Sequence, residues 1–136
     1  MGTWGVGPFD SDTAEDFVDG LENLSVPQRI EVLRAAFRRA IDAGDSEPLP
    51  GEIIAAAAVV AANMPAGETL SWNEDYPGIS EWLVRPIPSD VAALSIQALE
   101  AALPANGWFW QSWIDDEEKR ESEAVVSRIK SVLSSQ

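Results

Sequence analysis

The chain of 136 residues contains no cysteine and no histidine. It can therefore form no disulfide, and it offers neither thiolate nor imidazole to zinc, copper, haem iron or an iron–sulfur cluster. The same absences exclude Ser-His-Asp and Cys-His catalysis. A metal ion would have to be held by oxygen atoms alone, which favours magnesium, calcium or manganese. We expect no cofactor.

Basic residues are scarce as well. Nine lysines and arginines stand against 23 aspartates and glutamates, which gives a net charge of −14. Such a chain repels phosphate backbones, so nucleic-acid binding is not expected. A basic protein, a cationic small molecule or a divalent metal would be attracted to it. The same charge also suits a protein that needs only to stay in solution.

Long apolar runs are missing. The most apolar stretch covers residues 53–64 and is shorter than the roughly 20 residues that a membrane-spanning helix needs. The first residues are neither basic nor continuously apolar, unlike those of a signal peptide. These features predict a cytoplasmic protein that does not bind membranes.

Apolar residues recur at helical spacing, and no segment shows a convincing strand pattern. Ser25 and Gln28 have the spacing of a capping box at the start of one helix, and Ser89 is predicted to cap another. The alanine-rich segment 51–64 is apolar on every side, which predicts a buried central helix. The helices are expected over residues 12–24, 26–43, 51–64, 79–84, 90–103 and, last, through residues 125–133. We therefore predict an all-α fold, a single compact domain of five to seven helices around the central one.

The opening stretch "MGTWGVGPFDSD" predicts a non-helical N-terminal strap. Its glycines lack the third glycine of a dinucleotide loop and the Gly-Lys-Ser/Thr of a phosphate-binding loop. Trp4 and Phe9 are expected to pack against the helices, or to belong to a binding site that the strap helps to form. The strap brings Asp10 and Asp12 to the start of the first helix.

Acidic residues line one face of the first predicted helix. Asp12, Glu15, Asp16 and Asp19 follow the i, i+3, i+4, i+7 spacing that places side chains on one side. Three interpretations remain open. The face is solvated or paired with arginines of the next helix, or it binds a partner, or its first carboxylates hold a metal ion. The arginines concerned are Arg34, Arg38 and Arg39, and the metal candidates are Asp10, Asp12 and Asp16.

Aromatic residues gather in two irregular segments. Tyr76 lies in the first, between Trp72 and Trp82, and the second is "GWFWQSW" at residues 107–113. Core packing and ligand binding both fit such clusters. The tryptophans that we assign to a candidate binding site are Trp108, Trp110 and Trp113.

Glu52 is a further candidate for chemistry, because it precedes the apolar central helix. A buried carboxylate there would have a raised pKa and could act as a general acid or base, together with Asp10 or Asp16. Alternatively, Glu52 is stabilised by the free N–H groups at the start of the helix.

The N-terminal sequence resembles an uncharacterised bacterial family of domains of unknown function, whose members open with Trp-Gly-x-Gly-x-Phe-x-Asn-Asp. Ser11 replaces the usual asparagine, and Ala58 stands where the family often has a glutamate. Asn106 and Trp113 match a later family segment. The resemblance implies a small helical domain without an assigned activity. The matching N-terminal positions are Trp4, Gly5, Gly7, Phe9, Asp12, Ala14, Asp16 and Phe17.

Three functions fit these observations, and the last of them is a purely structural subunit of an oligomer. The first is a non-enzymatic interaction protein, similar to an immunity protein or antitoxin, which binds a basic protein. The second is a pocket protein or small enzyme, in which tryptophans line a cavity and carboxylates bind a small cationic ligand or a divalent metal. The sequence leaves the oligomeric state open.

Overall fold

The computed structural model describes residues 8–9, 12–43, 50–84, 86–103, 110 and 116–134, with five α-helices and three short 3₁₀ helices among them. None of these residues belongs to a β-strand. The all-α prediction is confirmed. The α-helices are α1 (Asp12–Glu22), α2 (Val26–Ala43), α3 (Pro50–Ala62), α4 (Ser89–Ala102) and α6 (Asp116–Leu133). The 3₁₀ helices are η1 (Pro65–Gly67), η2 (Ser71–Asp75) and η3 (Ile79–Glu81).

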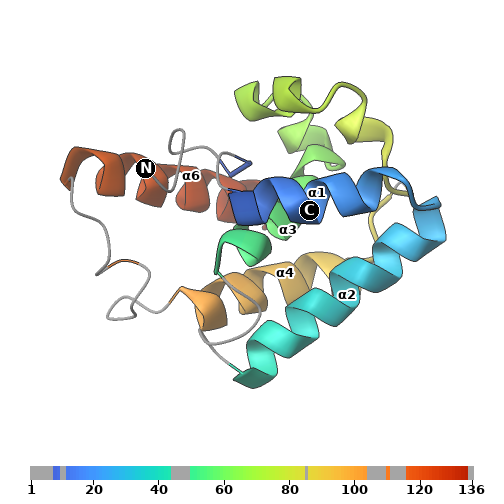
Figure 1. Cartoon of the computed structure of the whole chain (residues 1–136), viewed down its shortest axis with the longest axis horizontal. Coiled ribbons are helices and arrows are strands. Elements are labelled where there is room, and N and C mark those ends of the chain that lie inside the picture. The colour runs from blue at the N-terminus through green and yellow to red at the C-terminus, as the bar shows by residue number, and fades with distance from the viewer. Residues whose placement is uncertain are drawn as a thin grey trace.

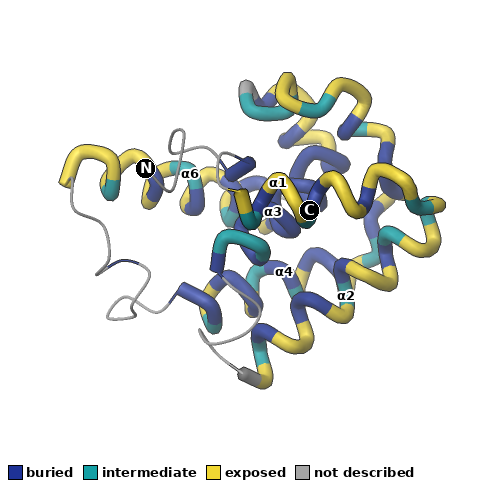
Figure 2. The backbone as a smooth tube through the Cα atoms, in the orientation of Figure 1, coloured by how far each residue is buried: buried dark blue, intermediate teal, exposed yellow. Residues whose placement is uncertain are grey.

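Helix α3 is the centre of the fold, as its composition predicts. Every residue from Ile53 to Ala62 is buried, and α1, α2, α4 and α6 all contact this helix (Figure 1). Figure 2 shows the result as a dark core surrounded by helices with one exposed side each. Alanine side chains are small, so the surrounding backbones approach α3 closely and its apolar surface is covered from all directions.

Helices α1 and α2 meet at a tight corner that local sequence explains. The backbone N–H of Ser25 donates to Oε1 of Gln28 at 3.0 Å, and the N–H of Gln28 donates to Oγ of Ser25 at 3.3 Å. This reciprocal pair is the predicted capping box. It starts α2 within a few residues of the end of α1, so that the two helices turn sharply against each other.

The predicted cap of α4 is wrong. Ser89 is the first helical residue, and Pro88 occupies the capping position without a side-chain hydrogen bond. The carbonyl oxygen of Pro88 accepts the N–H groups of Val91 and Ala92, at 3.0 and 3.4 Å. The helix therefore begins at Ser89, one residue earlier than it would if the side chain of Ser89 were the cap.

The connection between α3 and α4 is more regular than its sequence indicates. Its 3₁₀ turns include Ile79–Glu81, where a short helix was predicted. The buried side chain of Asn63 holds this segment, because its amide nitrogen donates to the carbonyls of Val59 and Ile79, both at 2.9 Å. Its oxygen accepts the N–H of Leu83 at 3.0 Å. The end of α3 is thereby tied to the end of the connection.

Candidate functional site

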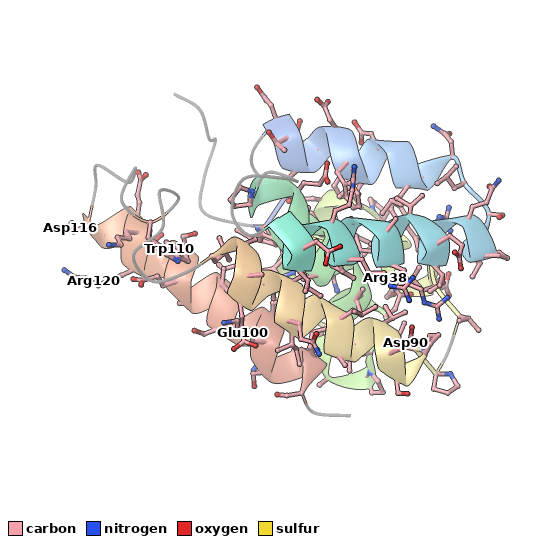
Figure 3. The ribbon with its side chains drawn as sticks, turned by 90° about the horizontal axis from the view of Figure 1, so that it is seen from below. Arg38, Asp90, Glu100, Trp110, Asp116 and Arg120 are labelled. Atoms are coloured by element: carbon pink, nitrogen blue, oxygen red, sulfur yellow. The ribbon has the colours of Figure 1, made fainter. Side chains whose placement is uncertain are left out.

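Helix α1 turns a purely acidic face to solvent. Asp12, Glu15, Asp16 and Asp19 are all exposed. The opposite side of the helix is buried in the core through Ala14, Val18 and Leu21. In Figure 3, α1 lies at the top of the molecule and oxygen-tipped side chains project from its outer edge. The predicted spacing thus places four carboxylates on one accessible surface, which we call the α1 acidic face.

Two of the three arginines proposed to neutralise this face pair with other residues. Arg34 donates from Nε and Nη2 to the two carboxylate oxygens of Asp90, at 2.9 and 3.0 Å, and this bidentate contact lowers the pKa of Asp90. Arg34 also reaches Glu31 at 3.2 Å. Arg39 lies 3.7 Å from Glu52.

The third arginine, Arg38, is exposed on α2 (labelled in Figure 3). Among the described residues, no ion pair reaches the α1 acidic face. The negative electrostatic potential of these four carboxylates is therefore not neutralised by an ion pair with the described part of the chain, and it acts on molecules that approach this surface.

A hollow of about 350 Å³ borders the α1 acidic face. Glu15 and Asp19 line it from α1, and Asp75 and Tyr76 line it from the end of η2. Phe9, which precedes α1 in the sequence, completes the described lining. Carboxylates from two parts of the chain thus line one hollow, whose exposed surface is almost entirely polar.

Tyr76 links the two sides of the hollow. Its hydroxyl donates to Oδ1 of Asp19 at 3.3 Å, across 57 positions of sequence. Burial raises the pKa of Tyr76, and the nearby carboxylates of Asp19, Glu15 and Glu22 raise it further. The phenol therefore stays protonated and acts as a hydrogen-bond donor.

Beneath this surface, Phe9 and Tyr76 belong to a continuous series of ring contacts. The Phe9 and Tyr76 rings meet edge to face, with centroids 5.3 Å apart, and Tyr76 meets Trp82 in the same manner at 6.1 Å. The guanidinium of Arg29 lies 4.9 Å from the centre of the Trp82 ring. Phe9 and Trp82 are buried, so these rings pack inside the protein and hold Tyr76 in place.

Arg29 anchors this series to α1. Its guanidinium donates to the carbonyls of Leu21 at 2.8 Å, Glu22 at 2.9 Å and Trp82 at 3.1 Å. The first two carbonyls lie in the last turn of α1, and that of Leu21 also accepts the backbone N–H of Leu24 at 3.0 Å. The sequence analysis did not assign roles to Arg29 and Asp75, because only the tertiary fold brings them to α1.

The other predicted site residues that the structure describes do not line the hollow. Asp12 and Asp16 do not line it, and no group of three acidic side chains in the described chain could hold a metal ion. Glu52 begins α3, and burial raises its pKa while Arg39 opposes that shift. Trp110 is buried, 7% exposed. Outside the described residues lie Trp4, Asp10, Trp108 and Trp113.

Comparison with known proteins gives one match. A family model described as a domain of unknown function, DUF4259, matches residues 2–124, a range that contains all the described residues lining the hollow. No curated protein and no solved structure matches this chain. Within the described residues, no helix is long and apolar enough to cross a membrane.

Proposed function

The chain belongs to this DUF4259 family of domains of unknown function, and we propose that it binds a basic protein through the α1 acidic face without catalysing a reaction. On this ground we assign the chain to the class of immunity proteins and antitoxins. The proposal includes a bacterial cytoplasm as its place of action.

The unbalanced charge of α1 is the observation that carries this proposal. The helix has acidic residues at positions 12, 15, 16, 19 and 22 and no basic residue. Like charges four residues apart destabilise a helix by roughly 0.2–0.5 kcal/mol per pair, and Asp12–Asp16 and Glu15–Asp19 are two such pairs. No ion pair within the described chain offsets this repulsion. A basic partner would offset the repulsion by placing positive charge beside these carboxylates.

The net charge of the chain strengthens the same argument. At −14, the whole molecule attracts a basic protein at long range, and the α1 acidic face gives that attraction a direction. Association is then expected to be fast and to weaken steeply as salt is added, because salt screens exposed charges over about 8–10 Å.

Charge neutralisation on two surfaces tests the proposal. One variant carries D12N, E15Q, D16N and D19N on α1. The control removes the same charge at Glu100, Asp116, Glu121 and Glu123, which are exposed on α4 and α6. Figure 3 labels Glu100 and Asp116, both remote from α1.

The assay is affinity capture from the source cell at low and high salt, followed by titration of the captured protein after purification. We expect the wild type and the control to bind the same basic protein at low salt, and the α1 variant to lose it. If the α1 variant binds that protein as tightly as the control does, the α1 acidic face is not the binding surface.

A further inference from the structure

The contacts between α1 and the connection that follows α3 point to a shared motion: we propose that α1 and residues 71–84 open together as one cooperative unit, which Arg29 fastens. During this opening α2, α4 and α6 stay packed on α3. We call α1 and residues 71–84 the α1 unit. The inference goes beyond the proposed function and requires no partner, because it concerns the chain alone.

Hydrogen bonds join the two parts of the α1 unit, although they are far apart in the sequence. The hydroxyl of Tyr76 donates to Asp19 on α1 at 3.3 Å. One side chain of α2 joins the parts a second time, because the guanidinium of Arg29 donates to two carbonyls in the last turn of α1 and to the carbonyl of Trp82. If one part leaves, the guanidinium is no longer held at both ends, and its bonds to the other part weaken.

The remaining helices keep their own contacts when the α1 unit opens. Helix α2 packs along α4, and α3 contacts α2, α4 and α6. Arg34 and Asp90 add a bidentate ion pair between α2 and α4. By contrast, α1 packs chiefly on α3, and it buries Ala14, Val18 and Leu21. The opening therefore uncovers one side of α3 and leaves the other contacts between helices in place.

The connection adds to the cost of this opening. Asn63, at the end of α3, bonds the carbonyl of Ile79 and the N–H of Leu83, and both bonds break when residues 71–84 leave. Ile79, Trp82 and Leu83 are also buried in the closed form. These contacts keep the closed form dominant, but they are fewer than those that hold α2, α3, α4 and α6 together.

Helix α1 depends on the unit because its own tendency to form a helix is low. It has 11 residues and includes Gly20, and isolated helices shorter than about 12–15 residues are marginal in water. Its like-charge pairs one turn apart, Asp12–Asp16 and Glu15–Asp19, weaken it further. An element of this kind belongs to the least stable part of a domain, where openings short of global unfolding occur.

Hydrogen–deuterium exchange of the full chain, followed by mass spectrometry at low urea concentrations, tests this inference. Urea favours only those openings that expose surface, so it separates the opening of the α1 unit from the fraying of helix ends. We expect the amides of α1 and of residues 71–84 to follow one urea dependence. Their opening free energy should be lower than that of the amides in α3 and α4.

Gly20→Ala tests whether the two parts are coupled. Its methyl group lies in open space, so it stabilises the α1 helix without touching residues 71–84. We expect exchange to slow by the same factor in both parts, up to about fivefold. Ile129→Val is the matched control, because Ile129 is buried on α6, which stays packed in the open form. It should speed exchange in α3 and α4 by roughly two- to tenfold and leave the α1 unit unchanged.

R29A tests whether Arg29 fastens the unit. Loss of its charged hydrogen bonds should speed exchange in both parts by about a hundredfold. In the R29A chain, Gly20→Ala should slow exchange in α1 more than in residues 71–84. The bond between Tyr76 and Asp19 remains there, but it is exposed and 3.3 Å long.

Three results would overturn the inference. In the first, Gly20→Ala slows exchange in α1 but not in residues 71–84 of the otherwise unchanged chain. In the second, Ile129→Val speeds exchange in the α1 unit as much as in α3, which would mean that α1 opens only with the whole domain. In the third, Gly20→Ala affects both parts equally in the R29A chain, so that Arg29 does not join them. None of these results bears on the capture of a basic protein, so this inference and the proposed function fail separately.

Discussion

Replacing Arg29 with alanine should destabilise the fold more than any other single arginine substitution in α2. Two of the three carbonyls that Arg29 bonds are partly buried, and its charge also lies over the Trp82 ring. Hydrogen bonds from charged groups contribute about 1.5–3 kcal/mol, and a cation–π contact at a partly exposed site adds about 0.5–1 kcal/mol. Allowing for partial solvation, we expect R29A to lower the free energy of unfolding by ~3 kcal/mol.

Urea unfolding followed by far-UV circular dichroism measures this loss. R38A is the control, since Arg38 is exposed on the same helix and should cost less than ~0.5 kcal/mol. R29K keeps the charge but cannot present three donors in a fork, so about half of the loss should remain. Two results would contradict this reasoning: R29A having at least the unfolding free energy of R38A, or R29K having the unfolding free energy of the wild type. Either would show that the hydrogen bonds of Arg29 do not stabilise the fold as argued.

Four further substitutions have clear expectations. Gly67→Ala should cost about 3 kcal/mol, because its methyl would collide with the backbone carbonyl of Ala61; a variant that melts like the wild type would contradict this. Gly20→Ala has open space around the new methyl and should raise the melting temperature, because alanine favours a helix by up to ~1 kcal/mol over glycine. Burial raises the pKa of Glu52 in the folded chain, so its charged form opposes folding above that pKa. Glu52→Gln should therefore raise the urea midpoint at neutral pH, and the gain should vanish below the ordinary pKa of a glutamate; a lower midpoint at neutral pH would show that attraction to Arg39 outweighs burial. The pKa of Asp90 is lowered by Arg34, so this pair stabilises the fold above the ordinary pKa of an aspartate, and the contribution is lost as the pH falls through the lowered pKa. Asp90→Asn should flatten the acid dependence of unfolding in that window, and an unchanged acid profile would mean that the pair contributes nothing.

The positions of the helices were predicted well from local sequence patterns, because each helix is determined mainly by residues close to it in the sequence. The capping box at Ser25 and Gln28 depends on backbone groups three positions away, and the structure contains it. From Ile53 to Ala62, α3 contains only apolar residues, which leaves this part of the helix no stable place except the interior. The start of α4 was missed by one residue. The backbone carbonyl of Pro88 accepts the first N–H groups of the helix, which the side chain of Ser89 was expected to accept, and a carbonyl is present in every residue and gives no sequence signal.

Long-range partners could not be predicted in the same way. The α1 acidic face follows from spacing alone, but the hollow beside it requires Tyr76 to return to Asp19 across 57 positions. That return depends on the Asn63 amide, which fastens the connection after α3 through bonds to Ile79 and Leu83. The sequence predicted Asn63 to lie in the buried segment 51–64, but it did not indicate which backbone groups its amide would bond. The arginines of α2 illustrate the same limit. Their charge predicts that they pair with carboxylates, but it does not identify which carboxylates those are.

The central position of α3 has a consequence for hydrogen exchange. Its backbone amides are covered by helices from both ends of the chain, so they become accessible only when the whole domain opens. The amides of α1, exposed along one side, can exchange through local fraying instead. A ligand on α1 would therefore protect α1 by direct contact, and it would slow exchange in α3 only by the amount that it stabilises the entire folded chain. The two helices thus report separately where a partner binds and how tightly it does so.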